Sequence, residues 1–195
     1  LYKDVLYPKW FNGEWDVYST TKSVYAPLGI KVFGGSSAWE AAQKDVGNTL
    51  KYKSRFLSPP GFASGTVADR IYNVRSIASA AVGKDSIMSI GGPREDSNLE
   101  ALAQELRVSM SPNQIAGEIF DISLTTIGRD YYPNANTKSG VDESAFLAME
   151  KVQQVISRRM DQLMSPGTQK VKNIETISIY RRESPTKVIG IQRTA

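Results

Sequence analysis

Three neighbouring polar residues, Asp69, Arg70 and Asn73, are the first candidates for a chemical site. Residues four apart share one face of a helix, so a helical segment would present Asp69 and Asn73 together. A carboxylate, a guanidinium and an amide at this spacing would form a polar cluster. The same residues also suit an ordinary helix start, with Asp69 as the N-cap and Arg70 in a surface ion pair. We favour this structural interpretation over a binding site.

Two further segments carry residue types used in catalysis. Glu14 and Asp16 would share one face of a strand, where paired carboxylates can act as acid and base. On an exposed face, however, such residues are usually solvated. The Gly-Gly-Ser-Ser stretch at 34–37 has neither the spacing of a phosphate-binding loop nor that of a nucleophile elbow. We expect it to lead into a helix.

The 195-residue sequence contains no histidine and no cysteine. These absences exclude a serine–histidine triad, a thiolate nucleophile and the common zinc sites. An enzyme would have to use carboxylates or an activated lysine, and no pattern identifies such residues. We therefore predict a protein that is not an enzyme and has neither catalytic residues nor a metal site.

The amino-acid composition further limits the class of protein. Hydrophobic residues make up 41% of the chain and charged residues 23%, which is typical of a globular protein. The net charge is +4, but basic residues occur in pairs at most, so a nucleic-acid partner is not expected. The apolar run at 77–82 is far shorter than the about 20 residues of a spanning helix. A single domain over 1–195 is predicted. Because the sequence begins with Leu1 and not with Met, we expect either that a targeting peptide was removed or that the sequence was trimmed.

Alternation and helical spacing predict the elements of the first half. Residues 13–22 alternate as a half-buried strand, with Gly13, Trp15 and Val17 on one face. A short helix is predicted from a capping box at Ser37 and Glu40 to Gly47. A second strand is predicted over 51–57 and a second helix over 67–83.

The second half is predicted to consist mainly of strands. Strands are expected over 86–90, 106–110 and 119–126, and a C-terminal hairpin over 174–191 that turns at 183–186. The segment 94–103 fits a short helix or a hairpin connection, and 131–136 is predicted to be a loop. Residues 142–164 have helical spacing, but a barrel would need a strand at 152–157, and this alternative stays open.

The alternation also suggests how such a barrel would close. Ile177, Ile179 and Arg181 share one strand face, as Gly13 and Trp15 do on the first strand. If both faces point inward, Arg181 lies over the indole of Trp15, a cation–π contact of roughly 0.5–2 kcal/mol when shielded from water. We expect Gly13, Trp15 and Arg181 to close the barrel, with the floor of a ligand site as the alternative.

Phe11-x-Gly13-x-Trp15 together with the late Arg181 resembles the lipocalin and wider calycin pattern. This resemblance implies an antiparallel barrel of about eight strands that often encloses an apolar ligand. The extra helices and the lack of a disulfide depart from the pattern. The expected fold is therefore mainly β, a calycin or lipocalin-like antiparallel barrel with two or three short helices.

A second resemblance runs along most of the chain. The Phe-x-Gly-x-Trp motif, the segment Val67-Ala68-Asp69-Arg70-Ile71-Tyr72-Asn73 and the segment 177–182 are similar to an uncharacterised family of cyanobacterial and plastid proteins. Members of that family are exported to, or expected in, the thylakoid lumen. The resemblance implies a photosynthetic setting and supplies no activity.

The resulting expectation is a non-catalytic auxiliary or assembly subunit in the chloroplast thylakoid lumen, peripheral to the membrane, that docks on a photosystem complex. Candidate partner contacts are the aromatic residues Trp10, Trp39, Tyr131 and Tyr132, because such rings contribute strongly to interfaces. The alternative is a lipocalin-like carrier of a lipid, a carotenoid or a chlorophyll-type pigment. No cofactor is expected beyond such an apolar ligand.

Overall fold

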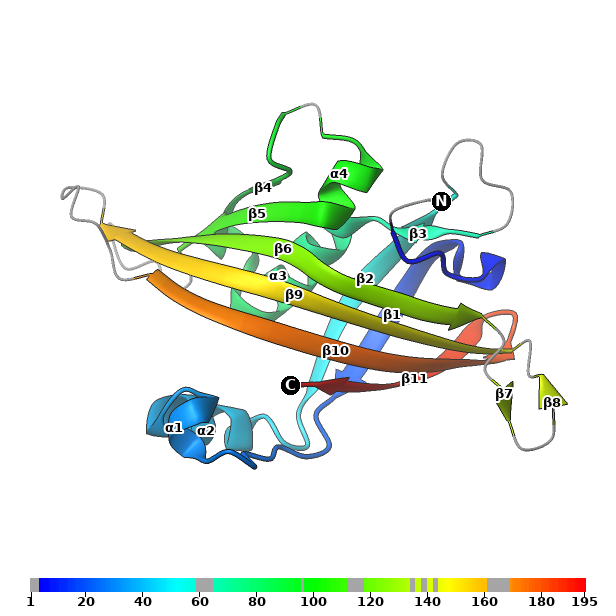
Figure 1. Cartoon of the computed structure of the whole chain (residues 1–195), viewed down its shortest axis with the longest axis horizontal. Helices are drawn as coiled ribbons and strands as arrows, with labels where there is room; N and C mark the ends of the chain where they lie inside the picture. Colours follow the sequence, from blue (N-terminus) through cyan, green and yellow to red (C-terminus); the bar gives the residue numbers. More distant parts are fainter. Residues whose placement is uncertain are drawn as a thin grey trace.

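The structure is a computed structural model that describes residues 4–58, 65–95, 97–111, 118–133, 136–137, 140–141, 144–160 and 169–195. Strands account for 55% of the residues that the structure describes, and the main sheet curls into an antiparallel half-barrel (Figure 1). The architecture is mainly β and calycin-like, as the sequence predicted. The described part contains four short α-helices, rather than two or three.

The half-barrel is a six-stranded sheet with the order β11-β10-β9-β6-β5-β4. Each of β6, β9 and β10 is 16 residues long, which lets the sheet curl around the protein's interior. Its strands are β4 (Ile87–Gly91), β5 (Glu105–Met110), β6 (Glu118–Pro133), β9 (Ala145–Met160), β10 (Gln169–Ser184) and β11 (Lys187–Thr194).

A smaller sheet crosses behind the half-barrel in the view of Figure 1. It contains β1 (Gly13–Thr20), β2 (Thr49–Leu57) and β3 (Val67–Ala68). The helices are α1 (Ile30–Phe33), α2 (Ser36–Lys44), α3 (Arg70–Val82) and α4 (Leu99–Gln104), with 3-10 turns η1 (Lys9–Phe11) and η2 (Lys84–Ser86). The short strands β7 (Asn136–Thr137) and β8 (Gly140–Val141) pair in an antiparallel two-stranded sheet.

Helix α3 covers the edge of β2 beyond the two-residue strand β3. The Asn73 side chain accepts from the backbone N–H of Arg55 at 2.6 Å and donates to its carbonyl at 3.1 Å. Ser76 Oγ accepts from the backbone N–H of Lys53 at 2.9 Å. These side chains satisfy backbone groups that a neighbouring strand would otherwise pair, so the helix protects an exposed sheet edge.

Aromatic side chains fill one end of the interior. Tyr7 and Phe11 come from the N-terminal segment, Phe56 from β2, and Phe146 and Tyr180 from the half-barrel. Ring centroids are 4.8 Å apart for Tyr7 and Phe56, and 5.1 Å apart for Phe11 and Tyr180. Phe146 is fully buried. The N-terminal segment therefore seals this end of the barrel.

The open alternative at 142–164 resolves in favour of a strand: β9 runs over Ala145–Met160. Phe146 and Ala148 are buried two residues apart, which is the period of a strand and not of a helix. Pairing with β6 on one side and β10 on the other outweighs the helical spacing. Residues 142–143 and 161–164 of this segment lie outside the described residues.

Two local predictions are wrong. Tyr131, Tyr132 and Pro133 belong to β6 and do not form a loop, because the strand continues past a bulge to its pairing with Phe146. The capping box at Ser37 is also wrong, since α2 begins at Ser36 with no side-chain cap. The chain enters α2 through Gly34 and Gly35, whose φ angles of 129° and 91° favour glycine.

Candidate functional site

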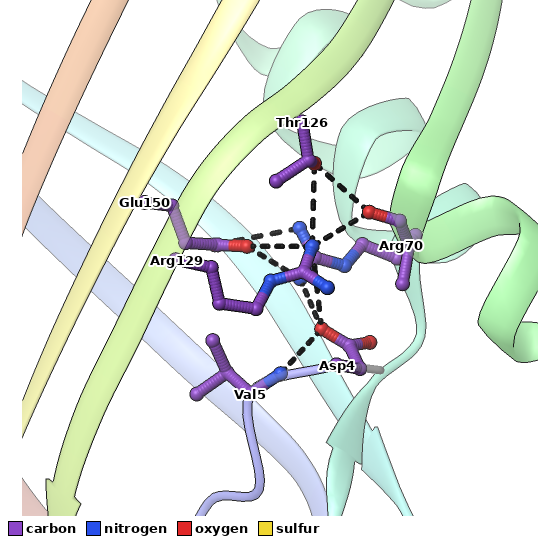
Figure 2. Close-up of polar contacts among 7 residues, drawn as sticks. Asp4, Val5, Arg70, Thr126, Arg129 and Glu150 are labelled. Atoms are coloured by element: carbon purple, nitrogen blue, oxygen red, sulfur yellow. Dashed lines mark hydrogen bonds and ion pairs between the residues drawn. The ribbon is translucent and has the colours of Figure 1, made fainter. Parts of the chain in front are cut away.

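Arg70 lies at the centre of a group of ionic side chains between α3 and the half-barrel (Figure 2). Its Nη2 lies 2.5 Å from Asp4 Oδ1 and 2.7 Å from Glu150 Oε1. Arg129 Nη2 lies 3.4 Å from the same Glu150 oxygen. The four residues come from the N-terminal segment, α3, β6 and β9, so we call them the four-segment ion cluster.

A β-bulge directs Arg129 into this cluster. The pairing of β6 with β9 shifts between Thr126 and Gly128, leaving Ile127 as the additional residue. The shift brings Thr126 and Arg129 to the same inner side, although a regular strand would place them on opposite faces. Both side chains donate to the carbonyl of Ala103 near the end of α4, at 2.9 and 2.6 Å.

The charges of the four-segment ion cluster balance, with two guanidinium groups and two carboxylates. Burial by itself would lower the pKa of Arg70, but the charges of Glu150 and Asp4 outweigh it and raise that pKa. Arg70 is thus held charged, and both arginines contact protein partners. The arrangement suits a connection between segments better than anion binding or proton transfer.

The predicted polar cluster is divided between two places. Asp69 caps α3, accepting from the Tyr72 backbone N–H at 3.0 Å, and pairs with Arg55 at 2.6 Å. Asn73 holds the same helix on β2. Arg70 instead points into the four-segment ion cluster, so the expected surface ion pair of Arg70 is wrong. Asp69 and Asn73 therefore have the structural role that the sequence favoured.

Trp15 and Arg181 do not form the expected stack. The Trp15 indole N–H donates to the Phe11 carbonyl at 2.7 Å. Arg181 is exposed on β10, because its neighbour Tyr180 packs against Phe11 and adjacent strand residues point to opposite faces. The prediction that Ile179 and Arg181 face inward is therefore wrong. The neighbouring residue Tyr180 faces inward instead.

Gly13 begins β1 with a φ of 112°, a conformation that favours glycine. The aromatic N-terminal segment thus closes this end of the barrel. Trp15 is held beside that segment by its hydrogen bond to the Phe11 carbonyl. The structure gives Gly13 a turn-forming role at this end and does not group it with Arg181.

The four aromatic candidates for partner contacts lie in different surroundings. Trp10 stacks on Phe11 with centroids 4.3 Å apart, and Tyr131 packs against Phe146 at 6.3 Å, so both belong to the interior. Trp39 meets Phe33 edge-on at 5.4 Å. Tyr132 is 48% exposed, which leaves it the most accessible of the set on the half-barrel.

Tyr132 belongs to a row of apolar side chains across the outer face of the half-barrel. Tyr132 pairs with Leu147, Leu147 with Ile179, and Ile179 with Ile191, so their side chains lie beside one another. Ile179 is 51% exposed and Ile191 is 74% exposed. We call these four residues the outer apolar row. Arg181 and Arg193 occupy positions on neighbouring rows of the same face.

Two hollows in the described part are open to solvent, and the first of them is lined mainly by polar groups. One of about 310 Å³ is lined by Asp16, Val17, Tyr18, Lys51, Tyr52, Lys53 and Ser76. Another of about 250 Å³ lies over β5, β6 and β9 and includes Arg107, Asp121 and Gln169. Across the residues that the structure describes, no three potential metal ligands converge. Within the same ranges, no helix is long and apolar enough to cross a bilayer.

Sequence reasoning missed Asp4, Arg129 and Glu150 of the four-segment ion cluster, as well as the outer apolar row. Charged residues in strands usually face solvent, and nothing local distinguishes these from surface charges. A signal for the row was present, because Ile177, Ile179 and Arg181 alternate with Ser178 and Tyr180. The prediction places Ile179 and Arg181 on the inner face of the sheet, whereas they lie on the outer face.

No curated protein and no solved structure matches the chain. A domain of unknown function, DUF6816, matches residues 2–194, nearly the whole sequence. The chain therefore belongs to the DUF6816 family.

Proposed function

We propose that this protein is a non-catalytic auxiliary or assembly subunit that docks through the outer face of its half-barrel on a photosystem membrane complex in the thylakoid lumen. The observation that carries the docking proposal is the outer apolar row. Four apolar side chains lie side by side on the outer sheet face, and three of them, Tyr132, Ile179 and Ile191, are 48%, 51% and 74% exposed. Contiguous exposed apolar surface of this kind commonly marks an interaction site.

The surroundings of the row also suit a protein partner. A stable interface buries about 800 Å² on each partner, which involves about 20–30 residues. The outer sides of three 16-residue strands and β11 provide a surface of that order. Tyr132 and Arg181 supply residue types that often dominate binding energy at interfaces.

The photosynthetic setting is a separate part of the proposal. It depends on the resemblance carried by Val67–Asn73 and the segments 11–15 and 177–182. The fold places these residues at structural positions: Asp69 caps a helix, Asn73 holds β2, and Arg70 connects four segments. Such residues would be required in any member with this barrel, whichever complex it binds.

The interior gives less support to a carrier of a lipid or pigment. The described aromatic end of the barrel is filled by its own side chains. The hollow of about 310 Å³ is open and lined by Asp16, Lys51 and Lys53, which does not match a mostly apolar ligand site. We therefore rank docking above ligand transport.

Fractionation of the organism that encodes the chain tests both parts of the proposal. The protein should be found in the thylakoid lumen and should migrate with a photosystem complex when gently solubilised membranes are separated on a native gel. A protein found only in the stroma or cytosol contradicts the location. A lumenal protein that never migrates with a membrane complex contradicts docking.

A further inference from the structure

A second exposed apolar surface lies far from the outer apolar row in the chain, in the connection between β1 and β2. Residues 25–33 form a turn and the one-turn helix α1, and we call this segment the α1 loop. Its exposed side chains are Tyr25 (77%), Leu28 (77%), Ile30 (41%) and Val32 (68%). Figure 1 shows α1 and α2 projecting beside the sheets as a separate lobe.

The local structure of the lobe keeps these side chains outward. Phe33 packs edge-on against Trp39 of α2 at 5.4 Å, and this pair is the apolar contact between the two helices. Gly29 has a φ of 87°, and its N–H donates to the Ala26 carbonyl at 2.9 Å in the turn before α1. The turn and the Phe33–Trp39 pair hold the loop in shape without covering Leu28 or Val32.

The charge around the α1 loop is basic. From residue 17 to residue 39 the sequence has Lys22 and Lys31 but no aspartate or glutamate. Lys172 of β10 also reaches the lobe, since its Nζ would lie 3.8 Å from a Cβ placed on Gly34. Three exposed lysines therefore lie in or near the lobe, although Glu40 and Asp45 follow on and after α2.

We propose that the α1 loop is a membrane-surface anchor that inserts into the headgroup region of an anionic lipid bilayer. Aliphatic side chains on such segments reach about 5–10 Å into the boundary between headgroups and acyl chains. Tyr25 suits the interface, where aromatic residues with a polar end concentrate. Lys22 and Lys31 carry the charge that anionic headgroups attract.

A lipid surface fits this segment better than a protein partner does. Only a few adjacent side chains protrude, whereas a stable protein interface involves about 20–30 residues on each side. The wide outer face of the half-barrel is the surface that matches a protein. The two surfaces therefore predict separable contacts, one with lipid and one with a membrane complex.

Co-sedimentation with lipid vesicles tests the anchor. The purified chain should bind vesicles of equal parts phosphatidylcholine and phosphatidylglycerol, and bind phosphatidylcholine vesicles more weakly. The paired change Leu28→Ser and Val32→Ser should weaken binding by about tenfold or more, because it removes inserted apolar surface. The paired change Lys22→Glu and Lys31→Glu should remove the preference for phosphatidylglycerol.

A matched control separates the anchor from the docking face. Ile179→Ser with Ile191→Ser removes a similar amount of exposed apolar surface, and it should leave vesicle binding unchanged. Thermal unfolding should show that both serine pairs remain folded, since all four positions are exposed.

Three outcomes would overturn the anchor: no vesicle binding by the parent protein, equal binding by the Leu28 and Val32 variant, or a solution dimer that only this variant disrupts. Each leaves the docking proposal standing, because docking is measured with the membrane complex and the outer apolar row.

Discussion

Arg70 and Glu150, which are 80 positions apart in the sequence, meet at 2.7 Å between helix α3 and strand β9. This contact joins the helix that protects β2 to the middle of the half-barrel. Asp4 adds the N-terminal segment to the same guanidinium, and that segment carries Tyr7 and Phe11 into the aromatic interior. The ion pair therefore connects the sealed end of the barrel to the sheet whose outer face is proposed to dock.

Replacing Arg70 by methionine should destabilise the protein by about 3–5 kcal/mol, because Asp4 and Glu150 would remain in the interior without this partner. Urea unfolding measures the change. Arg107→Met is the matched control: Arg107 pairs with Glu105 at 2.8 Å but is 60% exposed, so its loss should cost about 1 kcal/mol or less. Equal costs for the two variants would show that the cluster has no special structural role.

Asn73→Ala should destabilise the contact between α3 and β2 by about 1–3 kcal/mol, since it leaves both backbone groups of Arg55 without their side-chain partner. Hydrogen exchange should show faster exchange of the Arg55 amide. Asn48→Ala removes an exposed bond to the Lys44 carbonyl and should leave that amide unchanged. Unaltered exchange at Arg55 in the Asn73 variant would contradict the proposed edge protection.

Stability should decline in alkaline solution because the interior contains tyrosines. Burial raises the pKa of Tyr7 well above its ordinary value of 10.0, so the folded state keeps the proton longer than the unfolded state. The full contribution is present below pH 10.0 and is lost as pH rises from there through the folded pKa.

Tyr7→Phe should therefore show a shallower loss of unfolding free energy above pH 10.0 than the parent protein. Urea unfolding over a series of alkaline pH values measures this slope. Tyr18→Phe, at a 66% exposed position on β1, is the matched control for removing a tyrosine hydroxyl. A steeper slope in the Tyr7 variant would contradict this account.

The sequence predicts most strands because a strand with one covered face carries a period of two. Leu106 and Val108 show this clearly, and both are buried. It does not decide between helix and strand at β9, where helical spacing from Phe146 to Met160 coincides with a strand held by two long neighbours. The hydrophobic pattern within one segment contains no information about its pairing with β6 and β10, because that pairing depends on the whole sheet.

The candidate site residues are likewise predictable only where their role depends on neighbours in the sequence. Asp69 is recognisable as a helix cap because its role is fixed by the next few residues. Arg129 and Glu150 are not recognisable, since a bulge and three distant segments bring them together. The sequence predicts that Arg181 faces inward, because its strand has apolar residues on both faces. The packing of Tyr180 shows which of the two faces is the inner one.

The outer apolar row carries the central claim, and charge substitution within it is the most direct test. Ile179→Asp with Ile191→Asp should leave folding intact, because the two side chains are 51% and 74% exposed. Met88→Asp, at a 57% exposed position on β4, is the matched control. Each protein would be mixed with thylakoid membranes of the organism that encodes the chain, and its migration with a solubilised photosystem complex measured.

The account predicts that the parent protein and the Met88 variant migrate with the complex. The Ile179 and Ile191 variant should lose about tenfold or more in affinity, because charges replace two apolar side chains that docking would bury. Equal migration of all three proteins with the complex would contradict docking through the outer apolar row.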